Sequence, residues 1–195
     1  MLVFQSVTYF GIQKLEGPSH DVKNCIDEKI PYTPQFIVIY ILWYPMIAFF
    51  PVLLYYCSAS GYAVYMVAIT TDILISLAVY LVYPSSFERP APPDGFWGWI
   101  MRIVYRCDYK GKNCMPSMHC SMCFIIIAFS VSVKGIPLWM RMVFSIISVL
   151  IVFSTVFTKQ HVIIDVITAA LLAAVCCFAG GIADPESVLM ILGLR

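Results

Sequence analysis

The sequence predicts an all-α fold: a polytopic bundle of five to six transmembrane helices that forms one membrane-embedded domain over residues 1–195. Composition is the first observation behind this prediction. Of the 195 residues, 61% are hydrophobic and 12% are charged, whereas a soluble domain has about 45–50% apolar and about 25% charged residues. The second observation is that apolar segments long enough to cross a bilayer recur along the chain. The net charge of +1 says nothing useful about partners; we expect the lipid bilayer as a partner and no nucleic acid.

A helix needs about 20 apolar residues to cross the hydrocarbon core of a bilayer. Segments of this kind predict spans at residues 34–57, 62–83, 115–133, 138–157 and 162–182. Pro45 and Pro51 should kink the first of these spans. Residues 1–13 are apolar but short, and they form either the end of a tilted first span or an interfacial helix. They have neither the basic region nor the small-residue cleavage site of a signal peptide.

Short polar segments separate these spans. Residues 58–61 are long enough only for a tight turn, and a second turn follows at residues 134–137. The chain must also turn near Lys159, because one helix from about 138 to about 180 would be roughly 64 Å long, about twice the hydrocarbon thickness. In the long segment 84–114, two tryptophans beside arginines predict a short helix at the membrane interface, around residues 96–103.

Counting the spans places three polar residues on one membrane face. The loop 84–114 lies between two spans, and two further crossings return the chain to the same side before His161. Arg89, His119 and His161 are therefore expected to meet at helix ends on one surface, although they are distant in sequence.

The stretch 113–120 joins that loop to an apolar run. Pro116 is a helix-start signal, so the N–H groups of Ser117, Met118 and His119 should lie in the first helical turn with few intrahelical acceptors. A helix start of this kind, with a hydroxyl and an imidazole beside it, can bind an anion. The alternative is an ordinary capped membrane helix whose histidine lies at the water interface.

His161 and Asp165 form a second candidate group. They are four residues apart and should share one face of a helix. A carboxylate one turn away can hold the Nδ1 proton of the imidazole and leave Nε2 as a nucleophile or base. Asp165 also lies just inside an apolar run, where ionisable groups are costly and indicate function. The alternative is a buried pair that only ties two helices together.

These groups together resemble the motifs of the type 2 phosphatidic acid phosphatase superfamily. Pro-Ser-Met-His at residues 116–119 resembles its second motif. Ser154, with His161 seven and Asp165 eleven residues later, has the spacing of its third motif, and Arg89-Pro90 resembles the end of its first. The flanking sequences resemble small bacterial members related to the inositol phosphorylceramide synthases. The resemblance covers most of the chain from about residue 34, with the core motifs in residues 84–170.

The resemblance implies a metal-independent enzyme without a cofactor that acts on phospholipid or prenyl phosphate esters. His161 would attack phosphorus and form a phosphohistidine, and Asp165 would orient it. His119 would protonate the leaving alkoxide and then activate water or an alcohol. The phosphoryl oxygens would be held by a separate group of side chains and N–H groups. That group comprises Arg89, Ser117, Ser154 and Lys159.

Two departures from the family pattern affect the expected substrate. The first motif of the family has a Lys seven residues before its Arg, where this chain has Val82, and the third motif has an Arg where this chain has Thr155. Lys159 is the candidate to replace one of these cations, and Lys110 and Lys112 are expected on the same face. A site short of cations favours a phosphodiester donor, which has one negative charge, and therefore head-group transfer.

Three functions stay open on the sequence alone. The first is a phosphatase that passes the phosphoryl group to water, or a head-group transferase of the inositol phosphorylceramide synthase type that passes it to an alcohol. The second is an electron-transfer protein with His119 and His161 as axial haem ligands. The third is an inactive scaffold, suggested by the two absent cations.

The orientation in the membrane has two conflicting indicators. The loops on the expected active face hold nine of the twelve Lys and Arg residues, and the positive-inside rule would place this face in the cytoplasm. The family resemblance implies the outer face of a bacterial plasma membrane, and we expect that orientation because several of these cations can serve phosphate binding instead.

Other polar residues have simpler expected roles. Asp72, near the middle of a span, is expected to form an interhelical hydrogen bond, and residues 27–29 are expected to be a solvated interface. Cys107 and Cys114 flank one loop and can pair if that loop faces an oxidising compartment.

Overall fold

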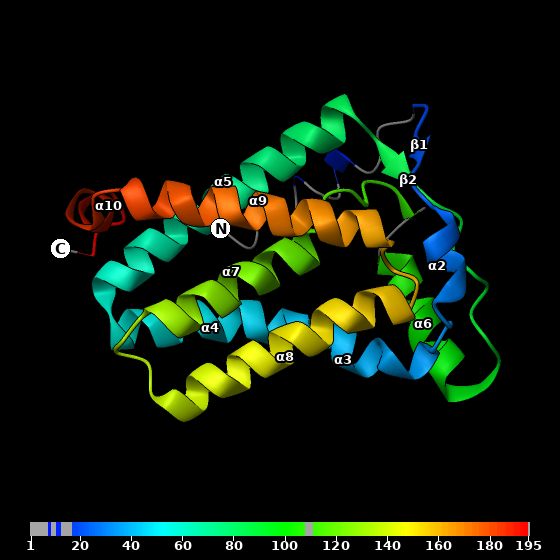
Figure 1. Cartoon of the computed structure of the whole chain (residues 1–195), viewed down its shortest axis with the longest axis horizontal. Coiled ribbons are helices and arrows are strands. Elements are labelled where there is room, and N and C mark those ends of the chain that lie inside the picture. Colours follow the sequence, from blue (N-terminus) through cyan, green and yellow to red (C-terminus); the bar gives the residue numbers. More distant parts are fainter. Residues whose placement is uncertain (1–7, 9–10, 13–16, 108–110, 195) are drawn as a thin grey trace.

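The computed structural model describes residues 8, 11–12, 17–107 and 111–194 (Figure 1). The described chain is mostly helical, with two very short strands. In chain order the elements are β1 (His20–Asp21), α2 (Cys25–Lys29), the 3-10 helix η1 (Pro34–Phe36), α3 (Ile37–Ile41), α4 (Trp43–Cys57), α5 (Ala59–Val82), β2 (Ser85–Ser86), α6 (Gly95–Cys107), α7 (Met118–Ser132), α8 (Leu138–Phe157), α9 (Ile163–Ile182) and α10 (Pro185–Ile191).

Within the described residues, four helices are long and apolar enough to cross a membrane. They are Pro34–Cys57, Ala59–Val82, Leu138–Phe157 and Ile163–Ile182. The predicted span 115–133 is also an apolar helix, but α7 has only 15 residues, or about 22 Å at 1.5 Å per residue. Residues 1–13 lie mostly outside the described residues, so their predicted role stays a prediction.

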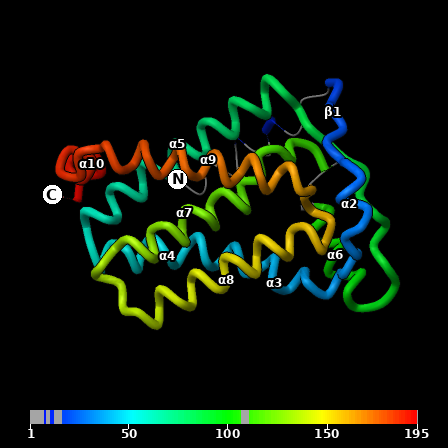
Figure 2. Tube along the Cα trace, in the orientation of Figure 1, coloured from blue at the N-terminus to red at the C-terminus, as the bar shows by residue number. Residues whose placement is uncertain are grey.

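Helix α7 forms the centre of the bundle. It packs against α5, α8 and α9 and runs between α9 and α4 in the trace (Figure 2). Its side chains Met122, Ile125 and Ile126 are almost completely buried in the main core. A helix that is apolar all round is suited to such a central position, because it has no face that needs water.

The first long helix is interrupted where a proline removes a hydrogen-bond donor. Pro45 has no N–H to donate to the carbonyl of Ile41, and the chain makes a single-residue break at Leu42 between α3 and α4. The helix predicted to be kinked at Pro45 is interrupted at this break, whereas α4 continues through Pro51. The predicted turn at 58–61 is shorter than expected, since α5 already begins at Ala59 with Ser58 as its N-cap.

Helix α10 was not expected from the sequence. Asp184 caps its N-terminus by accepting a hydrogen bond from Ser187 N, and Pro185 occupies the first turn. An Asp-Pro pair of this kind is a recognisable helix start. Helix α10 lies at the end of the bundle opposite the candidate site (Figure 1).

The loops and short elements gather at the other end of the bundle. Strand β1 pairs in parallel with β2, and Ser86 forms an antiparallel bridge with Lys112. Helix α6, close to the predicted interfacial helix, packs its buried Met101 and Val104 against the start of the first long helix, around Ile37 and Tyr40. This end therefore joins residues from the N-terminal segment, the 84–114 loop and the starts of α7 and α9.

Candidate active site

His161 lies in the turn between α8 and α9, not on a helix. Helix α9 begins at Ile163, so the prediction that His161 and Asp165 share a helix face is wrong. The turn is formed by Lys159 in a left-handed backbone conformation (φ 54°), and the Thr155 carbonyl accepts hydrogen bonds from the N–H groups of Gln160 and His161. The turn predicted near Lys159 is present.

The two side chains nevertheless meet. Nδ1 of His161 lies 3.1 Å from Oδ2 of Asp165, and the same oxygen accepts a hydrogen bond from Val162 N at 3.0 Å. A carboxylate can only accept, so this contact needs a proton on Nδ1, and Nε2 of a neutral ring then has the lone pair. The side chain of Asp165 is completely buried and His161 is 8% exposed. The pair has the arrangement of a nucleophile or base with a fixed tautomer.

The start of α7 differs from its prediction. Ser117 is the N-cap and Pro116 precedes it, so Pro116 is not in the first turn. Ser117 Oγ accepts from Cys120 N at 3.3 Å, and Ser117 N donates to the backbone carbonyl of Asp165, also at 3.3 Å. The N–H group of Ser117 is therefore occupied in this structure. The same contact joins the start of α7 to the first turn of α9.

His119 lies in a group of aromatic side chains. Its ring centroid is 4.6 Å from that of Tyr40, 4.2 Å from Trp43 and 6.4 Å from Tyr44, and it is 5.8 Å from the ring of His161. The sequence analysis did not predict this group around His119. The signal was the spacing of positions 40, 43 and 44, which share one helix face.

Arg89 reaches the turn that holds His161. Its guanidinium donates to the backbone carbonyl of Gln160 at 3.3 Å and lies 5.7 Å and 5.5 Å from the ring centroids of Phe87 and Tyr105. Gly111 allows this approach, because a Cβ at that position would lie 3.1 Å from Nε of Arg89. Arg89, His119 and His161 thus lie at one end of the bundle, on the face given by counting spans.

Two residues predicted to bind phosphate are engaged elsewhere. Nζ of Lys159 donates to the backbone carbonyls of Asp27 and Ile30, each at 2.7 Å, and partial burial lowers the pKa of this amine. Ser154 is completely buried, and its hydroxyl donates to the carbonyl of Ile151 at 2.7 Å within α8. The structure brings neither hydroxyl nor amine to the histidines.

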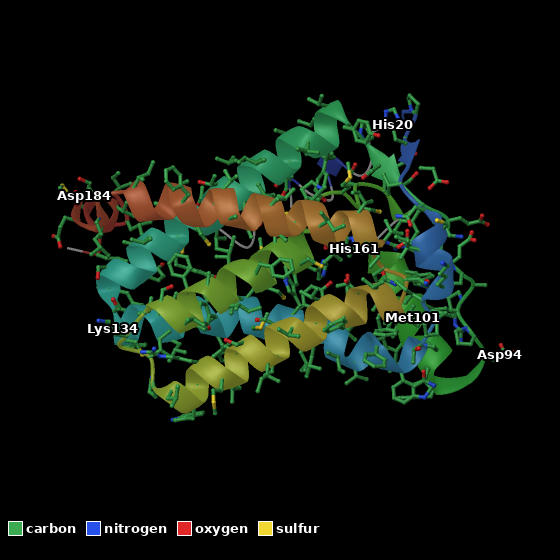
Figure 3. The ribbon with its side chains drawn as sticks, in the orientation of Figure 1. His20, Asp94, Met101, Lys134, His161 and Asp184 are labelled. Atoms are coloured by element: carbon green, nitrogen blue, oxygen red, sulfur yellow. The ribbon has the colours of Figure 1, made fainter. Side chains whose placement is uncertain are left out.

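A cleft of about 580 Å³ opens beside the site. Arg89, Lys159 and Val162 are among the residues that line it, but neither His119 nor His161 is. The cationic side chains along the cleft are Lys23, Arg89 and Lys159, and the anionic ones are Asp27, Glu28 and Glu88. The described lining is therefore formally neutral. Figure 3 shows His161 at this end of the bundle, far from Asp184 and Lys134 at the other.

Asp72 and Asp27 are both buried, but only Asp72 has the role that the sequence predicted. Asp72 is completely buried in α5 and accepts a hydrogen bond from Ser121 of α7 at 3.0 Å, as expected for an interhelical tie. Lys112 donates to the carbonyl of Gly17. Lys110 and the side chain of Cys107 lie outside the described residues, so the Cys107–Cys114 pairing stays a prediction. Asp27 is buried, so the solvated interface expected at residues 27–29 is wrong there.

Among the described residues, no group of three or more His, Cys, Asp or Glu side chains could hold a metal ion. No protein-family model matches the chain, and neither the curated proteins nor the solved structures include a match.

Proposed function

We propose that this protein is a membrane-embedded enzyme that transfers the phosphoryl group of a lipid phosphate ester through a phosphohistidine on His161. One observation carries the proposal: Asp165 holds Nδ1 of His161 at 3.1 Å while the ring of His119 lies 5.8 Å from the ring of His161. These three residues supply a nucleophile, a group that fixes its tautomer and a second proton carrier. They lie at the ends of apolar helices, where a lipid head group would meet the protein.

In the first step, the Nε2 lone pair of His161 attacks phosphorus and the bond from phosphorus to the lipid oxygen breaks. His119 donates a proton to the leaving alkoxide, which departs as an alcohol. The imidazolium formed on His161 is stabilised by the carboxylate of Asp165. Arg89, already at the backbone of Gln160, is the cation available for the phosphoryl oxygens.

In the second step, His119 takes the proton from an incoming hydroxyl group. The oxygen attacks phosphorus, the bond from phosphorus to Nε2 breaks, and His161 returns to its neutral form with Nδ1 still on Asp165. With water as the acceptor the reaction is hydrolysis. With an alcohol it is transfer of the phosphoryl group together with any head group that it carries.

The charges around the cleft favour a phosphodiester donor and thus head-group transfer. Lys159 donates to two backbone carbonyls, which leaves its ammonium group less able to replace a missing phosphate-binding cation. The described cleft lining has equal numbers of cationic and anionic side chains. A phosphomonoester carries about two negative charges near neutral pH, so it gains less from this neutral lining than it would from a cationic one. A diester carries one negative charge and needs fewer cations.

The test uses purified protein in detergent with a chelator present. The substrates are phosphatidic acid, a prenyl pyrophosphate, and phosphatidylinositol with a lipid alcohol as acceptor, and the His161→Ala variant is the control. A new phospholipid without free phosphate supports head-group transfer, whereas free phosphate from either of the first two substrates supports a phosphatase. No product from any substrate, or full activity in the variant, contradicts the proposal.

A further inference from the structure

The segment 24–33 crosses the end of the bundle beside the turn that holds His161. It contains α2 and leads into η1 (Figure 1). Hydrogen bonds join two parts of this segment to residues 157–163. Thr33 N donates to the carbonyl of Phe157 at 2.8 Å, on the α8 side of the turn. Asp27 provides the contact on the α9 side.

Asp27 is 2% exposed, and both of its carboxylate oxygens are occupied. Oδ1 accepts a hydrogen bond from Ile163 N at 2.8 Å, and Oδ2 accepts from Asn24 N at 2.9 Å. Ile163 is the first residue of α9, where N–H groups have no partner inside the helix. The negative charge of Asp27 also lies favourably at the positive end of the α9 dipole.

Lys159 ties the other end of α2 to the same turn. Its ammonium group donates to the carbonyls of Asp27 and Ile30 at 2.7 Å each. Ile30 is the C-cap of α2, and the last carbonyls of a helix are the groups that lack intrahelical donors. The contacts are therefore reciprocal. The side chain of Lys159 binds backbone carbonyls of α2 and its C-cap, and the side chain of Asp27 binds a backbone N–H of α9.

We infer that Asp27 is a positioning residue for His161, and that segment 24–33 is a clamp on the turn between α8 and α9. The inference rests on the proposed role of His161 as the nucleophile. His161 lies two residues from Lys159 and two from Ile163, so the clamp holds the backbone on both sides of it. A nucleophile that moves by about 1 Å can lose about a hundredfold in rate.

This role is separate from that of Asp165. Asp165 binds the imidazole and the N–H of Val162, whereas Asp27 binds the N–H of Ile163. Asp165 fixes the tautomer of His161, and Asp27 fixes where the backbone under it lies. Loss of Asp27 should therefore lower kcat, because the backbone that carries His161 is held less firmly.

The first experiment measures hydrogen–deuterium exchange of the full-length protein in detergent, and it does not depend on activity. In Asp27→Ala, peptides that cover residues 158–166 should exchange faster, while those from the middle of α7 and α5 keep the exchange of the unchanged protein. The matched control is Asp184→Asn, which removes another capping aspartate at the opposite end of the bundle. Unchanged exchange at 158–166 in Asp27→Ala overturns the clamp.

The second experiment measures kcat and KM with the substrate on which the unchanged protein is active. Asp27→Ala should lower kcat by about tenfold to a hundredfold, and Asp27→Asn, which keeps one acceptor oxygen, should retain more activity than Asp27→Ala. Asp184→Asn should keep its kcat. An equal loss in both aspartate positions, or a change in KM alone, overturns the positioning role.

The two experiments separate this inference from the proposed function. An unchanged protein that is inactive on every substrate contradicts the proposed function, and the exchange measurement then still decides whether the clamp exists. If Asp27→Ala does not fold, the comparison is made with Asp27→Asn. Full kcat in a folded Asp27→Asn with increased exchange at 158–166 overturns the positioning role, because the turn would then be loosened without effect on the reaction.

Discussion

The carboxylate of Asp165 accepts a hydrogen bond from Nδ1 of His161 at 3.1 Å, although His161 lies outside the helix that carries Asp165. The same oxygen also accepts from Val162 N at 3.0 Å. Asp165 therefore fixes the imidazole and the last residue before α9 at once. Both hydrogen bonds are formed between residues of the protein, so they do not need a bound substrate.

Asp165→Asn should leave the helices in place and lower kcat strongly. The amide can still accept one hydrogen bond through its oxygen, but its NH₂ group cannot accept from Nδ1 or stabilise an imidazolium. We expect a loss of about two to four orders of magnitude in kcat, as for the equivalent change in a serine protease triad. Steady-state kinetics measures the loss, and circular dichroism checks the helical content. Activity equal to that of the unchanged protein would contradict the role of Asp165.

His161→Ala should abolish both turnover and covalent labelling. With a lipid substrate that carries radiolabelled phosphate, rapid acid-free quenching should trap label on the unchanged protein as a phosphohistidine, which is a covalent intermediate of nucleophilic catalysis. The variant should carry no label. His119→Ala is the informative comparison, because it should still accept label from a substrate with a good leaving group, yet release it slowly. Label that persists in His161→Ala would place the nucleophile elsewhere.

Trp43→Leu should weaken the action of His119. The indole ring lies 4.2 Å from the imidazole and, with Tyr40, limits the tilt of the ring. Aromatic contacts of this kind are worth about 0.5–1.5 kcal/mol, so we expect kcat to fall by about two- to tenfold. Trp43→Phe should retain most of the rate because it keeps a ring at this position. Equal rates for Trp43→Leu and Trp43→Phe would show that the stacking has no part in catalysis.

Cys25 provides a test of orientation. It is an exposed free thiol at the start of α2, on the same face as the candidate site. If that face is outside, a membrane-impermeant maleimide added to intact bacterial cells that express the protein should label Cys25. Cys25→Ser should lose this label, and Cys57, at the opposite end of α4, should react only after the cells are opened. Labelling of Cys25 only in opened cells would place the active face in the cytoplasm.

The helices were predictable because hydropathy and length act locally. The turn at Lys159 followed from the length of one uninterrupted helix, and four of the five predicted spans of about 20 residues are long apolar helices. The predicted helix boundaries were less accurate than the predicted helices themselves. Pro116 indicated a helix start two residues too early, because Ser117 caps the helix with its own side chain. Asp184 and Pro185 also form a helix-start signal, and α10 begins there although no helix was predicted.

The site was predictable only where its residues are close in sequence. The spacing of His161 and Asp165 correctly indicated that they meet, although for the wrong geometric reason. Asp27 and Lys159 are 132 positions apart, and nothing in either local sequence indicates that a backbone carbonyl takes up the amine. The contact between the rings of Trp43 and His119 is likewise not indicated by either local sequence. Contacts of this range depend on how the whole bundle packs, which composition and periodicity do not describe.

The hydrogen bond from Ser117 N to the carbonyl of Asp165 has a mechanical consequence. It fastens the helix that carries His119 to the residue that holds His161. If α9 tilts to suit a thinner or thicker bilayer, this hydrogen bond and the packing of α7 against α9 favour a joint movement of the two helices at this end. The spacing of His119 and His161 then depends less on the thickness of the surrounding lipid.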